Sequence, residues 1–391
     1  MFTNPELVYS DAIVPPYPYA PCIATLFAPI ALLPFEIAHW IYLIMIYILA
    51  VLLLINFDKI LQIKGIENKL YRLIFLISIS NGLRYIQLFD YLTSKMWTAF
   101  FLILFIRREI EYRELNKDRE SFKFNFTQWM ILIFSIGISP QLFFLIFIYL
   151  FYNIKLREIF SKKQIQIYFL MILVFLIQNF MFLIILLISP ESIIYFFGGS
   201  WRGRHSVYWP NLNYDRLVEQ RVRLPADTLS HIFLVLSLYF DLSALKFDLL
   251  FPSLILMSFI TLVIHFKKYL VIEEKFGYFA LSSLFFNTMI APRYYIVLLP
   301  FIAILLIDKL NDCEKFMEFV KLNLILILGL ICIIILYFIP EIHYLLRVFP
   351  ILYNVPIVFL LLRQTFVYIV LTTTIFILNK KYKLSSLNIQ N

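Results

Sequence analysis

The residues best suited to chemistry gather in one polar loop, residues 189–230. The loop holds five arginines, no lysine and three of the eight glycines in the chain, and its densest stretch is GGSWRGRH, Gly198 to His205. An arginine side chain offers a planar fork of N–H donors that matches phosphate oxygens, and glycine lets backbone N–H groups come close to a ligand. This stretch therefore predicts a contact to a phosphate or a glycan.

Five residues of this loop are candidates for that contact. Arginines suit the charged part of a ligand, whereas aromatic and imidazole rings suit sugar faces. The predicted phosphate contacts are Arg202 and Arg204, and the predicted sugar or acceptor contacts are Trp201, His205 and Trp209. The alternative is that the arginines pair with acidic residues of the same loop or contact anionic lipids.

Three residues outside this loop complete the candidate set. A carboxylate can take the proton of an attacking hydroxyl, while a cation or a divalent metal ion stabilises a leaving phosphate. Asp11 is the candidate base, with a solvated turn or helix-cap residue as the alternative. Arg293 and Tyr294 are candidate phosphate contacts, and the alternative is an arginine that reaches lipid headgroups. The three cysteines are dispersed, so the sequence predicts no metal site built from them.

The composition assigns the chain to a bilayer. Of its 391 residues, 62% are hydrophobic and 18% are aromatic, which is more apolar surface than a soluble domain of this length could bury. The net charge of +9 would suggest nucleic acid in a soluble protein, yet the basic residues lie in short loops between apolar runs. We therefore expect an all-α, multi-pass protein of the cell membrane, with membrane lipids and no nucleic acid among its partners.

Apolar runs predict about nine to eleven membrane helices, because about 20 apolar residues cross the hydrocarbon core. The clear runs are Phe35 to Ile55, Ile165 to Ser189, Asp248 to Phe266 and Leu322 to Pro340. The shorter or interrupted runs are Leu70 to Leu83, Met96 to Ile106, Phe126 to Tyr152, Phe276 to Ile290, Tyr294 to Ile307, Leu345 to Leu362 and Thr365 to Leu378. We expect the charged residues to lie in the loops between these runs.

The basic residues predict the orientation, since short cytoplasmic loops retain lysine and arginine. Six loops hold 23 of the 34 basic residues and are assigned to the cytoplasm, namely 59–72, 107–123, 155–163, 267–275, 309–321 and 380–383. The turns at 84–95, at Ser139-Pro140 and at Pro292-Arg293 are then outside. The predicted organisation is an extracytoplasmic segment 1–34, a membrane part 35–188, an extracytoplasmic loop 189–230 and a membrane part 231–391 with a cytoplasmic C-terminus.

A proline-rich segment precedes the first apolar run. VPPYPYAPC, Val14 to Cys22, predicts an extended strap, and the residues that follow it up to Pro34 predict a short interfacial helix. The sequence has no basic residue before Lys59 and no signal-like start, so no span carries an outer N-terminus across the membrane. We expect that a first span precedes this sequence. The alternative is that Phe35 to Ile55 inserts with its N-terminus outward.

This segment and two later turns resemble a known family. Asn4-Pro5, Tyr17 to Pro21 and Leu26 to Pro34 resemble the NP, YPYPP and LxxPLALLP segments of the GT-C membrane glycosyltransferases of glycosyltransferase family 87. Gly137 to Pro140 is similar to the family's hairpin centred on Lys-Pro, with Ser139 where lysine is common. Ala291 to Tyr295 is similar to its late outer turn, with Arg293-Tyr294 where a histidine is often found. At the level of individual residues, the similarity covers about 30 positions of the chain.

The resemblance implies a GT-C-like helical bundle that acts as a hexosyltransferase. Members of this family transfer a sugar, commonly mannose, from a polyprenyl or dolichyl phosphate donor to a lipid, glycan or protein acceptor on the outer face of the membrane. The family's catalytic aspartate precedes the asparagine-proline pair, so the resemblance also implies the body of such an enzyme without its base. Two alternatives stay open, a transporter or flippase of lipid-linked sugars and an inactive fragment. The enzyme is preferred because glycines are few, no internal repeat is visible and the charges are expected to lie in loops.

Overall fold

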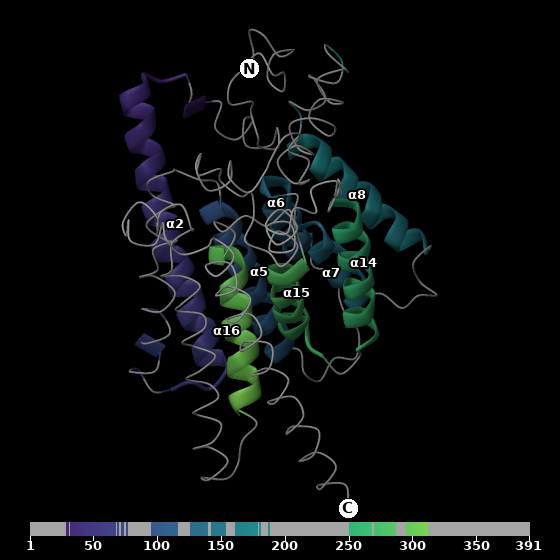
Figure 1. Cartoon of the computed structure of the whole chain (residues 1–391). Coiled ribbons are helices and arrows are strands. Elements are labelled where there is room, and N and C mark those ends of the chain that lie inside the picture. Colours follow the sequence, from purple (N-terminus) through teal and green to yellow (C-terminus); the bar gives the residue numbers. More distant parts are fainter. Residues whose placement is uncertain are drawn as a thin grey trace, which may run out of the picture. The chain divides into compact units, whose positions relative to one another are not determined.

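The described part of the molecule is a set of helices. The computed structural model describes residues 29–30, 32–67, 69, 72–73, 76, 95–115, 126–139, 142–153, 161–178, 180, 187, 250–267, 270–286 and 295–311. Within these ranges all regular structure is helical, which confirms the predicted all-α class for this part of the chain (Figure 1). The helices are α2 (Phe35–Ile63), α5 (Lys95–Leu115), α6 (Phe126–Ile138), α7 (Phe144–Asn153), α8 (Lys162–Gln178), α14 (Leu250–Phe266), α15 (Ile272–Phe286) and α16 (Tyr295–Asn311).

Most of these helices coincide with predicted apolar runs. α14, α15 and α16 begin within four residues of the predicted starts. The run from Phe126 to Tyr152 forms two helices, α6 and α7, and the sequence has Pro140 between them, a residue type that disfavours a continuous helix. The runs predicted at 322–340, 345–362 and 365–378, and most of 70–83, lie outside the described residues.

The expectation that charged residues lie only in loops is wrong for α5. The cytoplasmic loop predicted from Arg107 begins inside this helix, which continues to Leu115. Arg107 Nε lies 2.9 Å from Glu111 Oε1, one helical turn further on, and Glu109 is buried. An ion pair with this spacing stabilises a helix, so α5 extends past the end of its apolar run.

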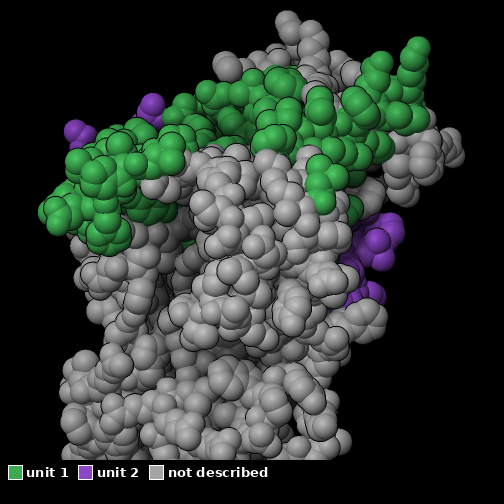
Figure 2. All heavy atoms as spheres, turned by 90° about the horizontal axis from the view of Figure 1, so that it is seen from above, with its two compact units in different colours: residues 1–56, 91–209, 247–252 green, residues 57–90, 210–246, 253–391 purple. Residues whose placement is uncertain are grey.

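The chain divides into two compact units, and Figure 2 colours the described residues of each. Unit 1 comprises Met1–Asn56, Tyr91–Trp209 and Phe247–Pro252, and its core is built by α5, α6 and α7, with α8 packed against α6. The ring of Phe101 on α5 packs on that of Phe134 on α6, with centroids 4.7 Å apart. Because Lys95 at the start of α5 contacts Ser139 just after the end of α6, these two helices are antiparallel.

Unit 2 comprises Phe57–Asp90, Pro210–Lys246 and Ser253–Asn391. In it α15 packs against α16, and the C-terminal end of α2 is tied to the start of α15. Gly65, two residues after the end of α2, has a φ of 81°, and the N–H of Ile66 donates to the Leu61 carbonyl at 3.0 Å as in a Schellman cap. The cap positions Lys64, whose Nζ lies 2.6 Å from Oε1 of the buried Glu273 in the first turn of α15.

Gly277 determines how closely α15 approaches α16. A Cβ atom at this position would lie 2.8 Å from the Leu305 Cβ and 3.0 Å from the Phe301 carbonyl oxygen, so α16 would have to move. We expect Gly277→Ala to lower the free energy of unfolding by about 1–3 kcal/mol, measured as a lower Tm in detergent. Ser282→Ala is the matched control on the same helix, because it removes only a bond to the Tyr278 carbonyl. A Gly277→Ala variant as stable as the wild type would contradict the close approach.

Candidate functional site

A buried lysine and two hydroxyl groups meet where α5 begins and α6 ends. Lys95 Nζ donates to Ser139 Oγ at 3.2 Å, and Ser139 Oγ lies 2.7 Å from Thr98 Oγ1. Lys95 is 4% exposed, and both hydroxyl residues are fully buried. These three residues are called the lysine–hydroxyl cluster below.

The two helix ends explain why these side chains meet. Lys95 and Thr98 are three residues apart, so they share one face of the first turn of α5. The N–H of Ser139 donates to the Ser135 carbonyl and closes the last turn of α6. The C-terminal end of a helix carries partial negative charge, which favours an ammonium group nearby. Antiparallel packing therefore places the Lys95 cation at the favourable end of α6.

The lysine–hydroxyl cluster has the chemistry of an anion contact. An ammonium group and hydroxyl donors make charge-assisted hydrogen bonds to phosphate oxygens. The three residues include no carboxylate, so the cluster supplies positive charge and hydrogen-bond donors but no general base. In the ranges that the structure describes, no group of three or more His, Cys, Asp or Glu side chains could hold a metal ion.

A second polar region lies toward the other end of α5. Arg107 Nη1 donates to Asn56 Oδ1 of α2 at 2.6 Å, and the Tyr149 hydroxyl on α7 donates to Glu109 Oε2 at 3.2 Å. Glu109 is 2% exposed and Tyr149 is fully buried. Because burying a carboxylate is costly unless it is hydrogen-bonded, the Tyr149 hydroxyl stabilises Glu109 in this position. α5 thus carries buried polar contacts on both sides of its apolar middle.

The site residues predicted from the sequence lie outside the described residues. They are Asp11, Trp201, Arg202, Arg204, His205, Trp209, Arg293 and Tyr294. Lys95 and Thr98 are not predicted as site residues. Their spacing on one helix face is visible in the sequence, but no sequence signal pairs Lys95 with Ser139, which is 44 residues further along the chain.

Comparison with known proteins gives no relative for this chain. No protein-family model, no curated protein and no solved structure matches it. The resemblance to glycosyltransferase family 87 therefore stays a prediction, and the candidate site is argued from its own geometry.

A double-mutant cycle tests whether the Thr98 and Ser139 hydroxyls interact. Thr98→Val and Ser139→Ala should each lower the free energy of unfolding, and their effects should be non-additive by about 0.5–3 kcal/mol because the two oxygens are 2.7 Å apart. The control cycle combines Thr98→Val with Ser135→Ala. Ser135 bonds to the Ile131 carbonyl of its own helix, so these effects should add. Additivity in both cycles would contradict the hydroxyl pair.

Proposed function

We propose that the protein is a multi-pass membrane glycosyltransferase of the GT-C type, which transfers a sugar from a polyprenyl phosphate donor. The lysine–hydroxyl cluster is the observation that carries this proposal. Ser139 stands where lysine is common in the Lys-Pro hairpin of glycosyltransferase family 87, and the Lys95 ammonium lies 3.2 Å from the Ser139 hydroxyl. The neighbouring helix therefore supplies the cation that the sequence pattern lacks at position 139.

Each candidate residue has a separate role in this proposal. Lys95 stabilises the negative charge that develops on the donor phosphate as the sugar leaves, the Ser139 hydroxyl holds its ammonium group, and the Thr98 hydroxyl in turn bonds to Ser139. The predicted outer residues add further phosphate contacts at Arg202, Arg204, Arg293 and Tyr294, sugar or acceptor contacts at Trp201, His205 and Trp209, and a base at Asp11. A divalent metal ion is an alternative source of positive charge. Mannose is the proposed sugar, following the family.

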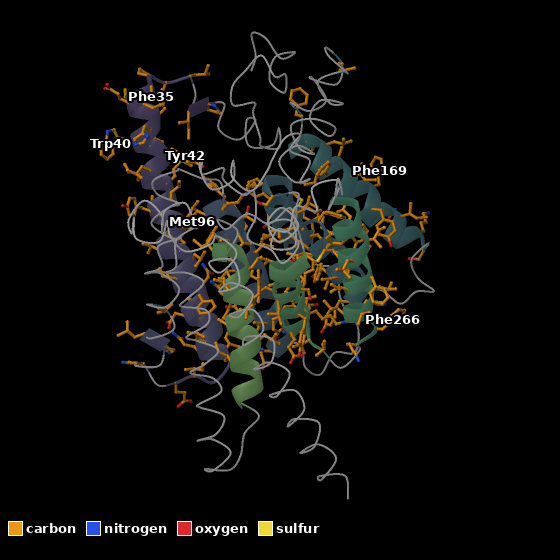
Figure 3. All side chains as sticks on the ribbon, viewed as in Figure 1. Phe35, Trp40, Tyr42, Met96, Phe169 and Phe266 are labelled. Atoms are coloured by element: carbon orange, nitrogen blue, oxygen red, sulfur yellow. The ribbon has the colours of Figure 1, made fainter. Side chains whose placement is uncertain are left out.

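Exposed apolar faces support the membrane placement. Among the described helices, α2 alone has both the length and the apolar composition needed to cross a membrane. Its exposed apolar side chains recur every three or four residues, at Ile37, Trp40, Ile44, Tyr47, Ile48, Val51, Leu52 and Ile55. α8 and α14 carry similar faces, which include Phe169 and Phe266, and both are labelled in Figure 3. Apolar faces of this extent are typical of a surface covered by lipid or by a partner.

Three contacts support the proposed grouping of segments on the same side of the membrane. Each joins segments that the charge distribution assigns to one side of the membrane, and each lies within one unit. Lys64 to Glu273 connects the predicted cytoplasmic loops 59–72 and 267–275, and Asn56 to Arg107 connects the cytoplasmic ends of two predicted spans. Lys95 to Ser139 connects two turns that are predicted outside.

Cysteine labelling tests the orientation. Glu36 and Lys59 are exposed on α2 near its opposite ends. In a cysteine-free background, Glu36→Cys should react with a membrane-impermeant maleimide in intact cells. Lys59→Cys should react only after the membrane is permeabilised. Labelling of Lys59→Cys in intact cells, with Glu36→Cys protected, would contradict the orientation.

Transfer in proteoliposomes tests the role of Lys95. With dolichyl phosphate mannose as the donor, Lys95→Met should reduce the rate of transfer by about 10- to 100-fold, since a hydrogen bond to a charged group contributes about 1.5–3 kcal/mol. Lys95→Arg should recover part of the rate. Lys59→Met makes the same change of charge at an exposed position of α2 and is the matched control. Undiminished transfer by Lys95→Met would remove Lys95 from the mechanism.

A transporter or flippase of lipid-linked sugars is the second candidate, and the buried charges of α5 favour it. Lys95 and Glu109 are both buried in this helix, and ionisable residues inside membrane helices commonly mark transport pathways. The same proteoliposomes separate the two functions. A flippase would move labelled dolichyl phosphate mannose to the other leaflet without forming a product, whereas a glycosyltransferase would consume it.

A further inference from the structure

α6 and α7 are each too short to cross a membrane. They have 13 and 10 residues, which corresponds to about 20 Å and about 15 Å of helix, whereas the hydrocarbon core is about 30 Å thick. The sequence that contains the two helices is also too short for two complete crossings. Between the flanking charges Lys123 and Lys155 lie 31 residues, and two complete crossings would need about 40.

The chain turns back directly after α6. The N–H of Leu142 donates to the Ser139 carbonyl at 3.0 Å, and α7 begins at Phe144. The ring of Tyr149 on α7 packs on Trp129 near the start of α6, with centroids 4.7 Å apart, and its hydroxyl donates to Glu109 of α5. α7 therefore returns toward the end of unit 1 from which α6 starts.

α2 provides a measure of depth, because the bond from Arg107 Nη1 to Asn56 Oδ1 places these two residues near the same level. For parallel axes, α2 rises from Asn56 to Phe35 by about 32 Å, close to the hydrocarbon thickness. α5 rises from Arg107 to Lys95 by only about 18 Å. Lys95 is thus level with Ile44 and about 14 Å below Phe35. Figure 3 shows Met96, the next residue of α5, at a lower level than Phe35.

We propose that α6 and α7 form a re-entrant hairpin, which enters and leaves the membrane on the cytoplasmic side and holds its tip at Ser139 within the membrane. The proposal rests on the membrane placement in the proposed function. Non-helical backbone at this depth has to be covered by protein or to line water, and both Ser139 and Leu142 are buried. The predicted outer turn then ends about 14 Å below the outer boundary. A ligand that contacts Lys95 must bring its anionic group to this depth.

Depth measurements with spin labels test the hairpin. Phe147 is 41% exposed on α7 and lies two residues before Tyr149. The depth of a label at this position therefore distinguishes a re-entrant hairpin from two complete spans. Labels at Phe35, Ile44 and Ile55, which are exposed along α2, calibrate the depth. In proteoliposomes, collisions with oxygen and with a nickel chelate added on one side should place Phe147 near Ile55 at the cytoplasmic boundary. Ile44 should lie about 16 Å deeper than Ile55, near the bilayer centre.

Two complete spans would place Phe147 near Phe35 at the outer boundary, and that result would overturn the hairpin. A label at Ile44 that collides freely with the nickel chelate from either side would instead overturn the membrane placement, and with it the proposed function. Pulsed dipolar measurements give a second readout that needs no lipid. The distance from Phe147 to Ile55 should be shorter than that to Phe35, and the reverse order would also overturn the hairpin.

Discussion

The antiparallel contact between α5 and α6 is the interaction on which the rest of unit 1 depends. It packs Phe101 on Phe134, and in the same apolar middle of α5 Leu102 and Phe105 are buried, with Phe105 packed on Tyr149 of α7. In the proposed membrane placement the hydrophobic effect would not favour helix association, so close packing and interhelical hydrogen bonds would have to hold such a pair. The bonds from Lys95 and Thr98 to Ser139 have this role at one end of the pair, and toward the other end the Tyr149 hydroxyl joins α7 to Glu109 of α5.

The charges on either side of the middle of α5 fix the helix along its axis. A shift of one turn, about 5.4 Å, would separate Lys95 from Ser139 and Arg107 from Asn56 together. The shift would cost Lys95 its bond to the buried Ser139 hydroxyl and Arg107 its bond across to α2, although Arg107 would keep its ion pair with Glu111 of its own helix. The apolar residues between them impose no such restriction, because leucine and phenylalanine side chains can repack. The polar contacts therefore determine the position of α5, while the apolar contacts provide most of its buried area.

Hydropathy predicted the existence of the helices better than their ends. α14 matches its predicted run closely, because its boundaries coincide with a change from apolar to charged residues. α2 and α5 extend past theirs, since Asn56 bonds to the Leu52 carbonyl of its own helix and Arg107 bonds to Asn56 and Glu111. Side chains that satisfy one another inside a fold look like loop residues in a sequence. For the same reason the lysine–hydroxyl cluster could not be predicted, because its partners come from different helices.

In the proposed membrane placement, depth and charge together bear on which ligand suits Lys95. Below the headgroups less water screens an ammonium group, so it attracts an anion more strongly than at the surface. The cost of moving an unpaired anion out of water to this depth is also higher. A soluble sugar nucleotide would have to leave water entirely. A phosphate carried on a polyprenyl chain already has its apolar part in the hydrocarbon, so only the headgroup loses hydration. Within the proposed function, a cation at this depth therefore favours a lipid-linked donor over a water-soluble one, on grounds that do not depend on the family resemblance.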